Sequence, residues 1–138
     1  MSTNRDPRAF AAPDPLAVAA PDPLAVADEW IAAWNAHDLD RILSHYAPDA
    51  VVTTPVTAVR VPESGGVVRG HDGLRAYWGP ALVDMPDLRF ELVEAMPTVD
   101  GVTILYRNHR AQLVAETVLW GADGFVHTAV VAYGAASV

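Results

Sequence analysis

The sequence predicts an α+β domain in which helices come first and an antiparallel sheet follows. Three observations support this fold class. Apolar residues recur at helical spacing between about residues 23 and 82. Alternating, β-branched segments then occupy most of residues 88–133. An Asp-Gly pair at residues 100–101 marks a hairpin turn between two of these segments.

The composition argues against several classes of partner. The chain of 138 residues suits one domain, and its formal net charge of -8 opposes binding to nucleic acid or to an anionic membrane. It contains no Cys, so disulfides and thiolate chemistry are excluded. Because there is neither a membrane-spanning apolar run nor a secretory signal pattern, we expect a cytoplasmic protein.

The N-terminal segment repeats one octapeptide. Residues 12–19 and residues 20–27 both read APDPLAVA. Paired prolines oppose one helix through both copies, so we expect a flexible arm over residues 1–21 and a folded domain over residues 22–138. Asp22 is suited to cap the first helix and Pro23 to occupy its first position. The first copy is interpreted as a neutral duplication, with a binding motif as the alternative.

The helices and strands follow in a regular order. Helices are expected at about residues 23–36, at about residues 39–46 after an Asp38 cap, and from residues 70–72 onward, where Pro80 should kink or end the third. A strand at about residues 50–54 leads into a long loop or broken hairpin at residues 55–66. The remaining strands are predicted at residues 88–96, 102–108, 113–120 and 125–133.

Four segments occur in an informative order: WIAAWNAHDLDRILSHYAPDAVVTTP, VVRGHDGLRAYW, ILYRN and AETVLWGADGFV. Together they resemble the nuclear-transport-factor-2-like superfamily, most closely its SnoaL-like branch, over about residues 24–133. The resemblance implies a cone-shaped roll. In such a roll a strongly curved antiparallel β-sheet wraps around three N-terminal helices and leaves an apolar pocket open at one end. The superfamily includes isomerases, cyclases, hydrolases, dehydratases and non-catalytic carriers, so the fold does not settle the activity.

Strand parity divides the last hairpin into two faces. If Trp120 and Phe125 are opposite partners, Glu116 faces Ala129 and Val118 faces His127. Val114, Val131 and Tyr133 share their face, and both faces are apolar, so hydropathy does not say which is concave. The resemblance decides, because the superfamily's cyclases and isomerases carry a functional acid in the strand that AETVLW matches. Glu116 occupies that position. The opposite face would carry Leu113, Ala115, Thr117, Leu119, Val126, Thr128 and Val130.

Glu116 is therefore the leading catalytic candidate. A carboxyl among apolar neighbours loses solvation, which raises its pKa, and a protonated carboxyl can donate to a carbonyl oxygen. The alternative is a structural ion pair between Glu116 and Arg107 or Arg110. The sequence does not fix the length of the hairpin turn at residues 109–111, so it does not decide which face of the sheet these arginines share. The predicted substrate-binding residues are Trp30, Trp34, Tyr46, Thr54, Trp78, Tyr106, Val118 and Tyr133.

At two positions the sequence departs from the pattern of ketosteroid isomerases, and both differences argue against steroid isomerisation. Thr54 stands where the resemblance places the base aspartate of ketosteroid isomerases, and a hydroxyl does not abstract a carbon-bound proton unaided. Trp30 stands where those enzymes have a tyrosine. His127 is a weaker catalytic candidate as general base, with an edge position facing solvent as the alternative.

No cofactor or metal is expected. The glycines at residues 65, 66 and 70 form no phosphate-binding fingerprint, and the histidines lack a metal-ligand spacing. The other four histidines are expected as helix caps or surface residues: His37, His45, His71 and His109.

Two functions remain open from the sequence. The first is an enzyme that performs cyclisation, isomerisation, dehydration or hydrolysis on an apolar, oxygenated small molecule. The second is a non-catalytic binding or dimerisation domain, in which Glu116 is ion-paired or the tryptophans fill the cone. In either case the apolar outer sheet face predicts a homodimer.

Overall fold

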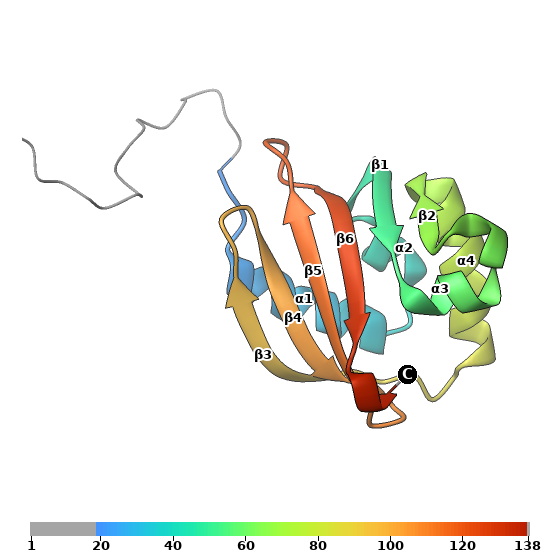
Figure 1. Cartoon of the computed structure of the whole chain (residues 1–138). Helices are drawn as coiled ribbons and strands as arrows, with labels where there is room; N and C mark the ends of the chain where they lie inside the picture. The colour runs from blue at the N-terminus through green and yellow to red at the C-terminus, as the bar shows by residue number, and fades with distance from the viewer. Residues whose placement is uncertain (1–18, 138) are drawn as a thin grey trace, which may run out of the picture.

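The computed structural model describes residues 19–137, so most of the predicted arm over residues 1–21 lies outside the described residues. Six strands form one curved sheet in the order β2-β1-β6-β5-β4-β3 (Figure 1). Neighbouring strands are antiparallel except β1 and β6, which are parallel. The α+β fold class is therefore confirmed. The strands are β1 (Tyr46–Thr53), β2 (Val67–Arg69), β3 (Glu91–Pro97), β4 (Gly101–Arg107), β5 (Leu113–Trp120) and β6 (Val126–Tyr133).

The first two helices begin where their capping residues predict. Asp22 Oδ1 accepts a hydrogen bond from Leu24 N at 3.2 Å, and Asp38 Oδ1 accepts one from Arg41 N at 3.1 Å. Helix α1 lies across the face of the sheet formed by β3 to β6, whereas α4 packs beside β1 and β2 (Figure 1). The helices are α1 (Pro23–Asn35), α2 (Leu39–Leu43), α3 (Pro55–Arg60) and α4 (Gly70–Asp84), with short 3-10 turns η2 (Pro62–Ser64) and η3 (Ala135–Ser137).

Two predictions about element boundaries are wrong. Helix α2 ends at Leu43 and Tyr46 already belongs to β1, because β6 pairs with the chain there and Val126 N donates to His45 O. The predicted loop at residues 55–66 contains α3, whose first backbone donor is capped by the Thr54 hydroxyl.

Of the two outcomes expected for Pro80, a kink or an end of the helix, the second does not occur, because α4 continues to Asp84. Pro80 is exposed, and so is Ala76, the residue whose carbonyl oxygen loses its helical partner.

The register of the last hairpin is two residues from the predicted one. Glu116 pairs with Val131 and Val118 with Ala129, and a shift of two residues keeps every side chain on its expected face. Next to Trp120 the pairing is irregular, so the residues beside the turn do not keep their expected faces. Val126 is buried at 3% exposure, which corrects its assignment to the outer face.

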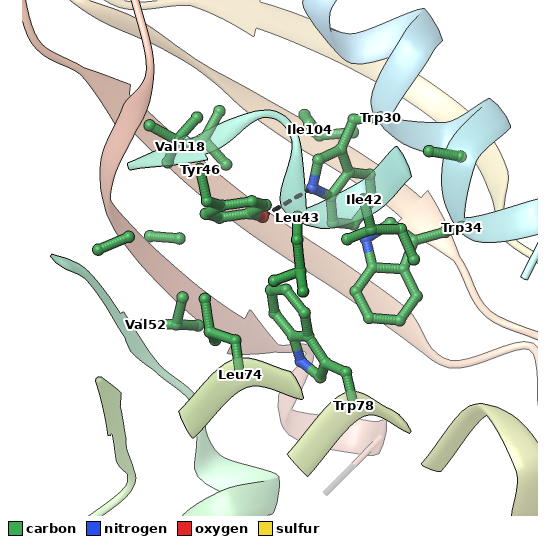
Figure 2. Close-up of a cluster of buried hydrophobic side chains, with 14 of the residues drawn as sticks. Trp30, Trp34, Ile42, Leu43, Tyr46, Val52, Leu74, Trp78, Ile104 and Val118 are labelled. Atoms are coloured by element: carbon green, nitrogen blue, oxygen red, sulfur yellow. Dashed lines mark hydrogen bonds between the residues drawn. The ribbon is translucent and has the colours of Figure 1, made fainter. Parts of the chain in front are cut away.

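The core lies between the inner face of the sheet and the helices. Figure 2 shows Trp34 of α1 pointing toward Trp78 of α4, and the indole nitrogen of Trp30 pointing toward the hydroxyl of Tyr46. Gly101 is required at the start of β4, because a Cβ there would collide with the carbonyl oxygen of Val118 on β5. None of the described helices has the length and apolar character needed to cross a membrane.

Candidate active site

A cavity of about 240 Å³ opens at the end of the sheet where β1, β4 and β6 end and β5 begins. Helices α1 and α4, the short helix α3 and the turn between β4 and β5 complete its wall. The lining residues are Trp30, Trp34, Val52, Thr54, Val56, Arg60, Tyr77, Trp78, Ala81, Met85, Leu88, Phe90, Tyr106, Asn108, His109, Arg110, Gln112, Glu116, Val131 and Tyr133.

Glu116 is the buried carboxyl of this cavity. It projects from β5, where its partners on the flanking strands are Ile104 and Val131, and it is only 5% exposed. Its Oε2 atom has no hydrogen-bond partner, and no described residue forms an ion pair with it. Burial in these apolar surroundings raises the pKa of Glu116 to about 8, so the carboxyl keeps its proton at neutral pH.

Neither of the arginines considered as partners forms an ion pair with Glu116 in the described chain. Tyr106 pairs with Val114 and lies on the Glu116 face, which puts Arg107 on the opposite face. The Nη1 atom of Arg107 donates to the carbonyl oxygen of Ala111 at 3.1 Å. Arg110 lines the cavity but is exposed, and it forms no ion pair in the described chain.

Aromatic rings form most of the inner wall. The rings of Trp34 and Trp78 meet edge-on, with 5.0 Å between their centroids. The Phe90 ring stacks on Trp30, with 5.7 Å between the centroids. Asn35 fixes the segment that carries Phe90, because its side-chain amide accepts from Phe90 N at 2.7 Å and donates to Phe90 O at 2.9 Å. The tryptophans therefore line the cavity without filling it.

Unpartnered polar atoms concentrate at this cavity. Four buried side-chain polar atoms among the described residues lack a partner, and three of them belong to cavity-lining residues. These three are Trp34 Nε1, His109 Nδ1 and Glu116 Oε2. Buried polar groups are normally hydrogen-bonded, so this concentration is typical of a site that a polar ligand completes. Together they offer an indole donor, an imidazole and a protonated carboxyl.

His109 was not predicted to be part of the site. It lies in the turn between β4 and β5, its side chain is 11% exposed, and its Nε2 atom is 4.0 Å from Asp87 Oδ1. The length of this turn could not be fixed from the sequence, and a histidine in a turn is usually a surface residue. No pattern in the sequence distinguishes it from the other histidines.

The structure places the other predicted site residues in three groups. Trp30, Trp34, Thr54, Trp78, Tyr106 and Tyr133 line the cavity beside Glu116. Tyr46 and Val118 do not, because both are fully buried in the core, where Trp30 Nε1 donates to the Tyr46 hydroxyl at 3.0 Å (Figure 2). Correcting the catalytic assignment, His127 lies outside the cavity and its Nε2 atom is 2.9 Å from Asp123 Oδ2. Within residues 19–137 no group of three potential metal ligands gathers.

The curved sheet, the packed helices and the open apolar cavity define a cone-shaped pocket protein. The model of the SnoaL-like domain matches residues 27–132, and the chain belongs to this family. A SnoaL-like protein of unknown function from Burkholderia thailandensis is 40% identical, with a TM-score of 0.78 over 80% of this chain and 92% of that chain. No curated protein matches the sequence.

More distant structures share the fold. A proposed isomerase of the SnoaL-like family from Agrobacterium tumefaciens is 18% identical, with a TM-score of 0.65 over 81% of this chain and 97% of that chain. A proposed polyketide cyclase from Sinorhizobium meliloti is 16% identical, with a TM-score of 0.64 over 78% of this chain and 94% of that chain.

Proposed function

We propose that the protein is an enzyme that uses Glu116 as a general acid in acid–base chemistry on an apolar, oxygenated small molecule. One observation carries this proposal: an unpartnered, buried carboxyl, neutral at physiological pH, lines an open aromatic cavity. A carboxyl that served only structure would be expected to have a cation or several backbone donors as partners. Glu116 Oε2 has neither.

The chemistry follows from the protonation state of Glu116. A protonated carboxyl that donates to a substrate carbonyl withdraws electron density and acidifies the adjacent carbon. The Trp34 indole supplies a second donor, and the His109 imidazole is the available group that accepts the carbon-bound proton. The enol that results is an intermediate common to isomerisation and cyclisation. In a dehydration, Glu116 would protonate the departing hydroxyl instead.

The comparisons support the same class of reaction. The two distant structural relatives are a proposed isomerase and a proposed polyketide cyclase. Thr54 at the end of β1 and Trp30 in α1 make a steroid isomerase the least suitable member of the class, because neither side chain supplies a base. We therefore assign the site to a carbonyl substrate without assigning a steroid.

Enolisation of a probe ketone tests the proposal. The protein should accelerate exchange of the α-protons of 2-tetralone in D2O, followed by proton NMR, above the rate in buffer alone. Glu116→Gln should slow the enzymatic exchange by about 10²-fold or more, because the acid is lost while the shape is kept. The exposed carboxyl of Glu91 provides the control, and Glu91→Gln should exchange at the native rate. Native protein no faster than buffer, or an equally active Glu116→Gln variant, would contradict general acid catalysis.

A further inference from the structure

Two arginines stand at the mouth of the cavity. Arg60 is the last residue of α3, and Arg110 lies in the turn between β4 and β5. Both side chains are exposed and both line the cavity, whereas Glu116 is buried within it. Both positive charges also lie near Tyr133. Burial raises the pKa of this tyrosine, and the charges of Arg60 and Arg110 oppose that rise. The two guanidinium groups therefore come from separate segments and converge on one opening.

Neither arginine is neutralised within the described chain. Arg41 pairs with Glu29, and Arg75 pairs with Asp40 at 2.9 Å, but Arg60 and Arg110 have no acidic partner. Asp87 approaches His109 in the same turn rather than Arg110. Five of the seven described arginines form no ion pair, and Arg60 and Arg110 are the two of these five that line the cavity. Two positive charges are therefore gathered at one opening.

Charged side chains are few in the described lining of the cavity. Apart from Glu116, Arg60 and Arg110, the lining side chains are aromatic, aliphatic or neutral polar, with Met85 and His109, and no described cation pairs with Glu116. An anionic group would lose its hydration beside Glu116 and would find no arginine there to offset that loss. At the mouth the same group would meet two guanidinium ions, whose planar donors match a carboxylate.

We infer that the substrate is an organic acid, with an apolar ring body in the aromatic cavity, a carboxylate held by Arg60 and Arg110 at the mouth, and a carbonyl or hydroxyl oxygen at Glu116. This inference rests on the proposed function for the oxygen at Glu116. The proposed carboxylate site depends only on the two arginines and not on the activity proposed for Glu116. The substrate therefore enters in one direction, with its charge remaining in the wet opening and its reacting oxygen in the dry interior.

A matched pair of probes tests the carboxylate site. Binding of 2-naphthoate and of neutral 2-naphthamide is followed through the fluorescence of the tryptophans that line the cavity. The native protein should bind 2-naphthoate about tenfold or more tightly than 2-naphthamide. The double variant Arg60→Gln, Arg110→Gln should lose this preference, with the affinity for 2-naphthamide unchanged within about twofold.

The double variant Arg69→Gln, Arg89→Gln is the matched control, because both arginines are exposed, both lie outside the cavity and their substitution removes the same number of positive charges. It should keep the preference for 2-naphthoate. Equal binding of the two probes to native protein, binding of neither, or an unchanged preference in the Arg60→Gln, Arg110→Gln variant would overturn the inference. Glu116 is intact in all these proteins. A preference that depends on the arginines, found together with an inactive protein in the exchange assay, would therefore reject only the catalytic proposal.

Discussion

Glu116 determines how the site depends on pH. Its pKa in the folded protein is about 8, against a reference value of 4.5, and burial is the cause. A group with a raised folded pKa contributes stability fully below its unfolded pKa and loses that contribution as pH rises through the folded value. The window for Glu116 therefore runs from about pH 4.5 to about pH 8. In the folded protein its use as a proton donor is likewise lost as pH rises through about 8.

Individual residues were predictable only where a pattern constrained them. Side-chain parity placed Glu116 and Tyr133 on one face, and this survives a register error of two residues. The family resemblance, rather than parity, identified that face as the inner one. The predicted pairing of His127 with Val118 is wrong, because irregular pairing next to the turn breaks the alternation of faces. His109 and Phe90 were missed because each lies in a connecting segment, where no period constrains the direction of a side chain.

At the scale of elements, the turn at residues 108–112 positions two site residues. Asn108 Oδ1 accepts from Arg110 N and from Gln112 N, each at 3.0 Å, and Asn108 Nδ2 donates to Gln112 Oε1 at 2.8 Å. Ala111 adopts a left-handed φ of 59°. One asparagine side chain thus closes the turn that carries His109 and Arg110 into the cavity wall.

Removal of this side chain should weaken the turn and the site together. Asn108→Ala deletes three hydrogen bonds and should lower the free energy of unfolding by about 1–3 kcal/mol, measured by denaturant titration. Asn108→Asp is the control, because it keeps the acceptor for both backbone donors and should recover most of the loss. An Ala variant as stable as the native protein would show that the turn does not depend on Asn108.

The main strands and α1 were predictable because their periods are long and their ends carry strong signals. The strand at Leu113–Trp120 has the predicted bounds, and α1 begins at its predicted cap. Helix α3 was missed because its six residues contain no helical period, and because Pro55 at its start and Pro62 beyond its end are both typical of loops. Pairing with β6, a strand far along the chain, moved the start of β1.

At the scale of the whole molecule, one face of strands β3 to β6 has no described helix packed against it. Helix α1 lies on one face of β3 to β6, and no described helix covers the other (Figure 1). Val130 on that face is 50% exposed, and Leu113, Thr117 and Leu119 are half-buried neighbours. An apolar sheet face of this kind is typical of an interface, and we propose a two-fold homodimer formed through it.

Sedimentation tests this assembly. The native protein should be a dimer at about 20 micromolar, a concentration at which a specific interface of micromolar affinity is largely formed. Val130→Lys places a charge at the proposed interface and should give a monomer. Val99, fully exposed in the turn between β3 and β4, provides the control, and Val99→Lys should stay dimeric. A monomeric native protein would rule out this interface.

The most direct test of the buried, protonated carboxyl compares native protein with Glu116→Gln in denaturant unfolding between pH 5 and pH 8. Gln keeps the shape but does not titrate, so its advantage in the free energy of unfolding should grow with pH. By pH 8 the gain over its value at pH 5 should reach about 1 kcal/mol or more. Glu91→Gln, which changes an exposed carboxyl, should show no such growth. A Glu116→Gln variant that is less stable than native at pH 8, with the deficit shrinking toward pH 5, would contradict the claim and identify an ion-paired Glu116.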